Sequence, residues 1–527
     1  MSSFRLELKN TEFKLPKLLI LEAKKRDEAE AIVQKIEKYE RSEKASSTVD
    51  QHKIDLIEIR KQQEVVGFAV NLEDKKQQKE KIKNLANDPP SKEILEFLKS
   101  AQEEAIARPS VTPKKFSTTA TNESINLFTS NGLHCILTHQ ITNLDVDIQP
   151  HRKEDLEIRS EIFNTILSIC KRLINLNFCQ LYRYRYLSTI IDCYPRKGCI
   201  SSTLTKLKIS VESLEDYLTV LNGDLYCLST LIINIKHIRY SLSESGTLPI
   251  LPSLKCFSLF SLESTYYYDR EVIPLLHRMI NLEELTLFLY AVRWQSTFID
   301  GVQLQDQIIM RLPQLNKFTF SIYTTDCCYN KDVNFEFQPN KDLGRSFTHK
   351  IFRQVASYVH INRLGTGGDS HVYSLPYEFE DFIHLNNSFP GGMFNKVVRL
   401  KMLDAFPFEH TLFKTVSDSF PQLKHLIIWN DKPQERKHCS SVLNVFPHLI
   451  LLDLLGAHMS YAEELLYNTN SILPRLHDLH IQYESLRMIT NNFTIDVACL
   501  NCNKLRKLNL NEVTVLPENF HQYFPLI

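Results

Sequence analysis

Apolar and polar positions along the chain repeat one short phrase, apolar-x-x-apolar-x-apolar. Clear copies are LPSLKCFSL, INLEELTL, LPQLNKFTF, FPQLKHLII, FPHLILLDL, LPRLHDLHI and CNKLRKLNL. The first apolar position of each copy falls at Leu173, Leu204, Leu228, Leu254, Leu282, Leu315, Val397, Leu423, Leu449, Leu476 and Leu505, with a weaker copy at Ile141. Successive copies lie mostly 24 to 33 residues apart. Self-similarity at such a period predicts a solenoid, in which each repeat stacks on the next.

Each phrase predicts a short strand whose side chains alternate between two faces. In the copy that begins at Leu423, His425, Ile427 and Trp429 should point outward. One repeat cannot bury its apolar edge alone, so the repeats are expected to form one continuous parallel sheet over residues 121–527. The predicted inward residues are Leu426, Ile428, Leu452, Leu454, Leu479 and Ile481.

The segments between the strands predict outer helices, because residues 272–279 and 461–466 carry apolar residues at helical spacing. In five copies a proline stands two residues before the first leucine, where a helix must end. The predicted fold class is therefore α/β, a leucine-rich-repeat solenoid with a curved parallel sheet and outer helices. A doubly wound α/β enzyme is the alternative, although such folds lack a recurring consensus and usually carry a glycine-rich ligand turn.

The array contains one gap, since the copy after Leu315 begins only at Val397. Residues 321–396 are therefore expected to hold degenerate repeats or an inserted segment. Glycines cluster in this gap at 365–368 and at 391–392, but no Lys-Ser/Thr follows either cluster. A flexible loop is favoured over a phosphate-binding loop.

Residues 1–115 differ from the rest, because they mix both charge signs in a Gln-rich, aromatic-poor background. Apolar stripes over 29–39 and 94–105 predict short helices, and no sustained heptad favours a long coiled coil. Residues 108–113 and the Ser/Thr run that follows predict a linker. The expected domains are a charged helical extension with its linker at 1–115 and the repeats at 116–527.

Composition excludes several classes of partner. Lys plus Arg and Asp plus Glu each number 62, so there is no global electrostatic footprint for nucleic acid or for a membrane surface. The sequence shows neither a secretion signal nor an 18-residue apolar stretch, which predicts a cytoplasmic or nuclear protein with reduced cysteines. Cys499 and Cys502 have the spacing of half a zinc site, but no second half lies at a usable distance, and packed thiols are favoured. We expect no metal and no cofactor.

The repeats, with the closing stretch Pro517-Glu-Asn-Phe-His-Gln-Tyr-Phe-Pro525, resemble the leucine-rich-repeat half of F-box proteins over residues 121–527. That resemblance implies a substrate receptor of a cullin-based ubiquitin ligase, with an N-terminal F-box that docks on the ligase adaptor. An F-box normally opens Leu-Pro-x-Glu-Ile. The chain departs from this at Leu15-Pro16-Lys17-Leu18, where Leu18 replaces the acidic residue, so the F-box itself is not recognisable.

The outward positions of the predicted strands are mostly polar, with an apolar exception on neighbouring strands. The predicted partner-binding residues are Trp429, Ile427, Leu451, Leu455, His425, Asp453 and His480. Exposed apolar groups with a polar rim mark interaction sites, and Trp is enriched at hot spots. The alternative is that a neighbouring loop covers them.

The sequence therefore predicts a non-enzymatic module that binds a protein partner. A free-standing scaffold or inhibitor would use the same surface without a ligase link. The alternative from another class is an enzyme with its site in 321–396, which would need convergent titratable residues in a closed pocket.

Overall fold

The computed structural model describes residues 4–6, 19–21, 114–119, 137–147, 155–179, 202–214, 225, 227–240, 251–293, 298–326, 340–361, 368–435, 442–511, 516–517 and 520–524 of the chain. The chain divides into two compact units, Met1–Lys92 and Glu93–Ile527. In the first unit, strands β1 (Phe4–Leu6) and β2 (Leu19–Leu21) pair antiparallel. The helices predicted over 29–39 and 94–105 lie outside the described residues.

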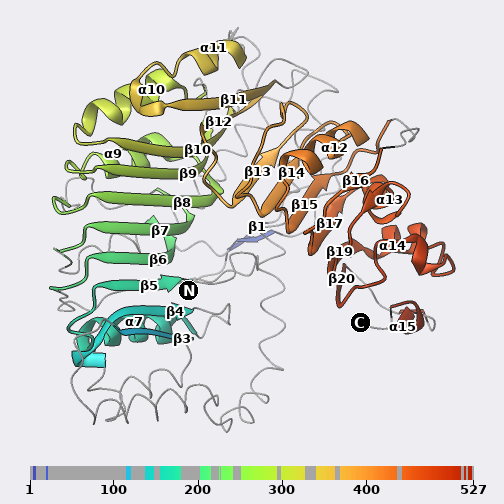
Figure 1. Ribbon diagram of the computed structural model, residues 1–527, viewed down its shortest axis with the longest axis horizontal. Helices are drawn as coiled ribbons and strands as arrows, with labels where there is room; N and C mark the ends of the chain where they lie inside the picture. The colour runs from blue at the N-terminus through green and yellow to red at the C-terminus, as the bar shows by residue number, and fades with distance from the viewer. Residues whose placement is uncertain are drawn as a thin grey trace. The chain divides into compact units, whose positions relative to one another are not determined.

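The second unit contains a ten-stranded sheet, here called the first sheet, in the order β11-β12-β10-β9-β8-β7-β6-β5-β4-β3 (Figure 1). Its strands are β3 (Lys114–Thr119), β4 (Ile141–Asp147), β5 (Asn175–Cys179), β6 (Lys206–Ser213), β7 (Thr230–His237), β8 (Cys256–Thr265), β9 (Glu284–Arg293), β10 (Lys317–Asp326), β11 (Gln354–Ile361) and β12 (Gly368–Leu375). All neighbours from β3 to β10 pair in parallel. This run of parallel strands coincides with the repeated phrase.

The sequence had indicated a linker for the Ser/Thr run after residue 113. The structure shows a strand there instead. Residues Lys114–Thr119 form β3, the edge strand, which pairs in parallel with β4. Phe116 lies opposite Leu144 in this pairing. Threonine and aromatic residues have a high propensity for strands. Pairing with β4 also gives the backbone groups of this segment their hydrogen bonds.

Equivalent positions of the repeated phrase align across the first sheet. One inward row runs through Leu176, Leu207, Leu231, Phe257, Leu285 and Phe318. All six side chains are buried in one apolar core. The turns repeat as well: the Lys255 amide donates to the Ser229 carbonyl, and the Glu283 amide donates to the Lys255 carbonyl. Each repeat therefore completes its neighbour's backbone hydrogen bonds and buries its neighbour's leucines.

A second, six-stranded sheet has the order β13-β14-β15-β17-β19-β20 and is parallel throughout. Its strands are β13 (Asp381–Leu385), β14 (Arg399–Leu403), β15 (His425–Asn430), β17 (Leu451–Ala457), β19 (Asp478–Gln482) and β20 (Lys507–Asn511). The six residues predicted to point inward, on β15, β17 and β19, are all buried there. Strand alternation was thus predicted correctly.

The expectation of one continuous parallel sheet over 121–527 is wrong, because the array is divided into these two sheets. In the gap the chain forms helix α11 (Asn340–Arg345) and then strand β11, which pairs antiparallel with the following strand β12. Strand β12 is also antiparallel to β10. Two antiparallel strands cannot continue the parallel repeat, so the parallel stacking ends here and begins again at β13.

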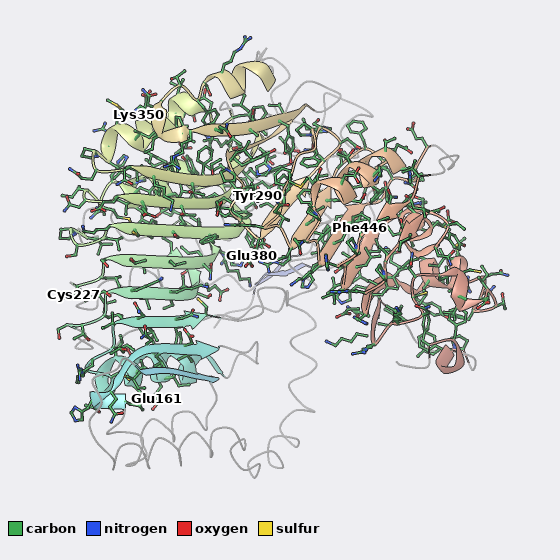
Figure 2. The ribbon with its side chains drawn as sticks, viewed as in Figure 1. Glu161, Cys227, Tyr290, Lys350, Glu380 and Phe446 are labelled. Carbon is green, nitrogen blue, oxygen red and sulfur yellow. The ribbon has the colours of Figure 1, made fainter. Side chains whose placement is uncertain are left out.

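Aromatic residues join the two sheets. Positions of β9 and β10 that would face solvent in a free sheet, such as Phe288 and Tyr323, are buried in the core of the second sheet. Tyr290, labelled in Figure 2, is buried there as well. The Phe288 ring lies 5.2 Å from Phe379, and the Tyr290 ring lies 4.5 Å from His384. Aromatic residues on the outward face of the first sheet therefore form part of the core of the second sheet.

Short helices and turns lie between the strands. Besides α11 they include α7 (Asp155–Ile169), the π-helical turn η3 (Tyr268–Val272), α9 (Ile273–Leu276), α10 (Gly301–Gln307), α12 (His410–Ser419), α13 (Met459–Leu466) and α14 (Tyr483–Ile489), and α15 (Phe520–Tyr523) follows the last strand. The helical predictions for 272–279 and 461–466 thus fall on η3, α9 and α13. None of the helices in the described part of the chain has the length and apolar character needed to cross a membrane.

Candidate functional site

The predicted partner-binding residues all lie in the second sheet. The outward side of β14, β15, β17 and β19 is here called the binding face. His425 lies between Arg399 and Leu451 in the strand register, and Ile427 lies between Lys401 and Asp453. Asp453 in turn lies opposite His480. The structure therefore brings the predicted residues of three strands onto one surface.

Ile427 is not the exposed anchor that the sequence had indicated. Its side chain is only 6% exposed, and Asp453 beside it is only 7% exposed. Ile427 occupies the middle of an interior strand, with Lys401 and Asp453 on either side, so its neighbours shield it. Half-exposed apolar side chains remain at Leu403, Trp429, Leu451 and Leu455.

Trp429 has a different neighbour from the one expected. A bulge in the pairing of β15 with β17 places Gly456, rather than Leu455, opposite Trp429. A Cβ at Gly456 would come within 3.1 Å of the indole, so a larger residue there would push the ring away by a few tenths of an ångström. The Lys401 ammonium lies 4.8 Å from the ring centroid. Trp429 is thus held in place by contacts from both neighbouring strands.

Two carboxylates meet on one imidazole at the other side of the face. His480 Nδ1 lies 3.1 Å from Asp453 Oδ2, and His480 Nε2 lies 3.4 Å from Asp478 Oδ1. Carboxylates only accept hydrogen bonds, so both contacts are satisfied only when both ring nitrogens carry protons. Consistently, the hydrogen bond to Asp453 and the nearby negative charges raise the pKa of His480 despite its partial burial. Sequence alternation placed Asp478 beside His480 but could not show the bond to Asp453.

Arg399 and Asp381 also shape the face, and the sequence analysis did not select them. Arg399 Nε lies 2.8 Å from Asp381 Oδ1, while its Nη2 lies 2.9 Å from both Asp381 Oδ2 and Glu380 Oε2. Burial, Arg399 and Lys424 lower the pKa of His425 in the neighbouring strand. Asp381 lies in the segment without a recognisable phrase, so no repeat position indicated its role.

The segment 321–396 does bring titratable residues together, as the enzyme alternative requires. His371 Nε2 lies 2.9 Å from Ser321 Oγ, and His371 Nδ1 lies 3.3 Å from the Tyr358 hydroxyl. Ser321 Oγ lies 3.1 Å from the Tyr377 hydroxyl, which donates to the Asp381 carbonyl. His371 is 0% exposed, and burial lowers its pKa to about 3.

Hydrogen-bond directions in this buried chain oppose a Ser-His catalytic pair. Because Tyr377 donates to Asp381, its oxygen accepts from Ser321, and Ser321 in turn accepts from His371 Nε2. The nitrogen that faces Ser321 therefore already carries its proton and cannot act as a base on the serine. All members are buried, so a substrate cannot reach Ser321 Oγ in this conformation.

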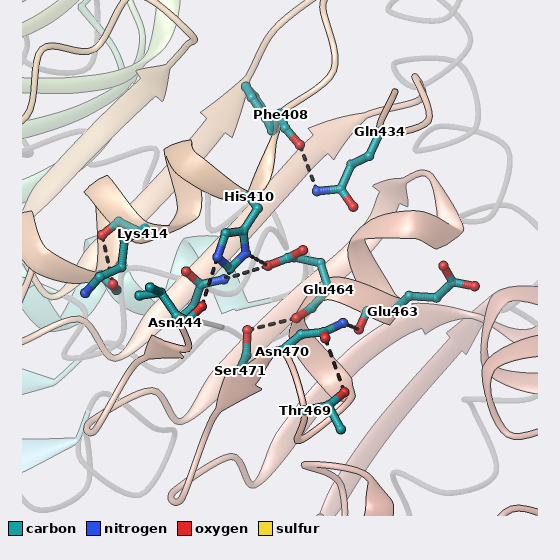
Figure 3. A network of polar contacts seen from close by, with 12 residues as sticks. Phe408, His410, Lys414, Gln434, Asn444, Glu463, Glu464, Thr469, Asn470 and Ser471 are labelled. Carbon is teal, nitrogen blue, oxygen red and sulfur yellow. Dashed lines mark hydrogen bonds and ion pairs between the residues drawn. The ribbon is translucent and has the colours of Figure 1, made fainter. Parts of the chain in front are cut away.

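A second polar network lies among the outer helices of the second sheet (Figure 3). His410 of α12 approaches Glu464 of α13, with 2.8 Å between Nδ1 and Oε1, and Asn444 donates to the same oxygen at 2.6 Å. The Ser471 hydroxyl donates to the Glu464 carbonyl. Glu464 is 1% exposed. This network ties α12, α13, β16 (Asn444–Val445) and β18 (Ser471–Ile472) together, and we assign it a structural role.

Comparisons with known proteins identify no family. No protein-family model matches the chain, and a search of the curated proteins finds no significant match. The described residues also contain no group of three or more His, Cys, Asp or Glu side chains that could hold a metal ion. Functional inference therefore depends on the repeats and on the chemistry of the binding face.

Proposed function

We propose that this chain is a leucine-rich-repeat solenoid that captures a protein partner on the binding face of its second sheet. The observation that carries the proposal is Trp429, a half-exposed aromatic ring held between Lys401 and Gly456. An aromatic anchor whose position is fixed before binding loses little conformational entropy when a partner docks. Trp is also the residue type most enriched at interface hot spots.

The strands below Trp429 support this role. Leu426, Ile428, Leu452 and Leu454 are buried directly beneath the face. Parallel pairing on both sides of β15 restrains its backbone. A surface on such strands varies little in shape. The half-buried Leu451, opposite His425, and Leu455 therefore add apolar area to this face without a cost for ordering a loop.

The resemblance to the repeat half of F-box proteins supports a cellular context, substrate reception for a cullin-based ubiquitin ligase in the cytoplasm or nucleus. In that context residues 1–115 would contact the ligase adaptor and the binding face would hold the substrate. A free-standing scaffold or inhibitor would use the same face without the adaptor. Capture of the purified adaptor by the full chain separates these two contexts.

The binding face is tested by Trp429→Ala. If Trp429 is a hot spot, affinity for a captured protein falls by roughly thirtyfold, about 2 kcal/mol, while the free energy of unfolding changes by no more than about 0.5 kcal/mol. Tyr240→Ala is a matched control, because Tyr240 is an exposed aromatic residue after β7 of the first sheet. Equal losses for both variants, or a loss of stability with unchanged affinity, would refute the assignment.

A further inference from the structure

Strand β20 forms one edge of the second sheet (Figure 1). It pairs in parallel with β19, and no other strand of the described residues pairs with it. The Lys507 amide donates to the carbonyl of His477, which directly precedes β19. Backbone groups of successive residues in a strand point to opposite sides, so the amides and carbonyls of Leu508 and Leu510 point away from β19. The edge therefore presents the hydrogen-bonding groups that one further strand needs.

The apolar row beneath β20 is incomplete as well. Leu508 and Leu510 lie opposite Leu479 and Ile481 in the strand register. The two residues of β19 are 0% exposed, whereas the two leucines of β20 pack against the same core and are only partly buried. A further strand would cover these leucines in the way that β20 covers the side chains of β19.

The amino-terminal end of this edge is positively charged. The basic side chains there are Lys504, Arg506 and Lys507. All three are exposed, and none of them forms an ion pair with the parts of the chain that the structure describes. Asp478 lies opposite Lys507, but its carboxylate is shared with the imidazole of His480. The nearest acidic residue that follows in the sequence, Glu512, comes after the other end of β20. Positive charge therefore exceeds negative charge where β20 begins.

We propose that the edge of β20 binds an extended acidic segment of a partner protein, which adds to the second sheet as a strand. Side chains of an added strand alternate between two faces. Its apolar residues then cover Leu508 and Leu510, and its Asp or Glu residues lie on the side of Lys507. A second copy of the chain would bring the same excess of basic residues to the edge, so the charge favours an acidic partner. This site lies three strands from Trp429 and does not depend on the proposed function.

A labelled peptide of four Glu-Val pairs, titrated against the full-length chain by fluorescence anisotropy, tests the charge of the site. We expect saturable binding that Arg506→Glu weakens roughly tenfold. Lys424→Glu is the matched control, because Lys424 is exposed, follows the first leucine of its repeat as Arg506 does, and lies before β15. It should change the affinity by less than about twofold. Equal losses for the two variants would overturn the assignment to β20.

The hydrogen bonds of the edge are tested by Leu510→Pro. Proline removes the amide that points away from β19 and leaves the pairing with β19 in place, so peptide affinity should fall more than about tenfold. Leu510→Ala removes the side chain but keeps this amide, and it should weaken binding less. Peptides with N-methyl groups on alternate residues apply the same test to the unaltered chain, whether or not Leu510→Pro folds. One of the two alternate sets should lose binding and the other should keep it.

The outcomes also separate this site from the binding face. Trp429→Ala should leave peptide affinity unchanged, and a loss would move the peptide to the binding face and overturn the inference about β20. Binding that survives both N-methylated sets would be charge attraction without an added strand, which also overturns it. Absence of binding by the Glu-Val peptide has the same meaning. Sedimentation of the chain alone checks for a second copy: self-association that Leu510→Pro abolishes would show that the edge serves a dimer instead.

Discussion

Strand β6 of the first sheet and strand β15 of the second sheet begin two residues after the first leucine of the same phrase. The outward residues of β6 are Lys206, Lys208 and Ser210, whereas those of β15 are His425, Ile427 and Trp429. Their inward residues are apolar and buried in both cases. The inward positions are therefore constrained by stacking, while the outward positions can differ, and those of β15 include the apolar residues Ile427 and Trp429.

The two sheets also differ in what covers them. Aromatic residues of the second sheet and of the loop before it bury the carboxyl-terminal outward positions of β9 and β10. In the second sheet, by contrast, the outward side chains of β15, β17 and β19 stay half-exposed except Ile427 and Asp453. The first sheet thus uses part of its outward face to anchor the second sheet, whereas most outward side chains of β15, β17 and β19 stay accessible.

The largest expected effect comes from placing a charge in either core. Leu452→Asp should destabilise the second sheet by roughly 5 kcal/mol, because an unpaired carboxylate and a cavity replace a fully buried leucine. Leu285→Asp is the equivalent change in the first sheet, where Leu285 is equally buried. Hydrogen exchange should show protection lost chiefly in the altered sheet. Equal loss in both sheets for either variant would mean that the two cores unfold as one.

The next effect concerns the aromatic contacts between the sheets. Phe382 is fully buried, and its ring lies 4.8 Å from His371 of the first sheet and 5.4 Å from Phe420 of the second. Phe382→Ala should cost about 3–5 kcal/mol and separate the unfolding of the two sheets into two transitions. Calorimetry measures both effects. A single transition at lower temperature would show that other contacts keep the sheets coupled.

Strand alternation explains how much of this fold could be predicted from sequence. Burial of Leu426, Ile428 and Leu479 follows from a period of two within one strand, which is local information. The missing phrase located an interruption at 321–396, but the division into two sheets could not be predicted, because β12 pairs with β10 across residues that carry no phrase. Non-local antiparallel pairing of this kind leaves no periodic signal.

The candidate site was only partly predictable for a related reason. Alternation placed Trp429, Leu451 and His480 on the outward face, and the structure agrees. Exposure depends on neighbouring strands, so Ile427 was wrongly expected to be accessible. The bulge that places Gly456 beside Trp429 shifts the register by one residue, and only the paired strands reveal it.

A pH-dependent effect contrasts the buried His371, between the sheets, with the histidines of the binding face. Burial lowers the pKa of His371 to about 3, so the folded protein holds it neutral while the unfolded chain protonates it below about pH 6.5. Stability should therefore fall as the pH drops from 6.5 toward 3, by about 1.4 kcal/mol per pH unit from this residue. His371→Gln should flatten the slope of unfolding free energy against pH in that range. An unchanged slope would place the acid-sensitive group elsewhere.

The smallest expected effect belongs to His480, whose pH dependence has the opposite sign. Its pKa is raised in the folded protein, chiefly by the hydrogen bond to Asp453. The pair therefore stabilises the fold fully below the unfolded pKa of about 6.5, and this contribution disappears as the pH rises through the folded pKa.

Asp453→Asn should lower the pKa of His480 in an NMR titration and reduce stability near pH 6 by less than about 1 kcal/mol, because the pair is partly solvated. The same titration in Asp478→Asn is the comparison, since its contact with His480 is longer by 0.3 Å and should contribute less. Equal shifts in the two variants would show that the imidazolium is held by overall negative charge rather than by the bond between β17 and β19.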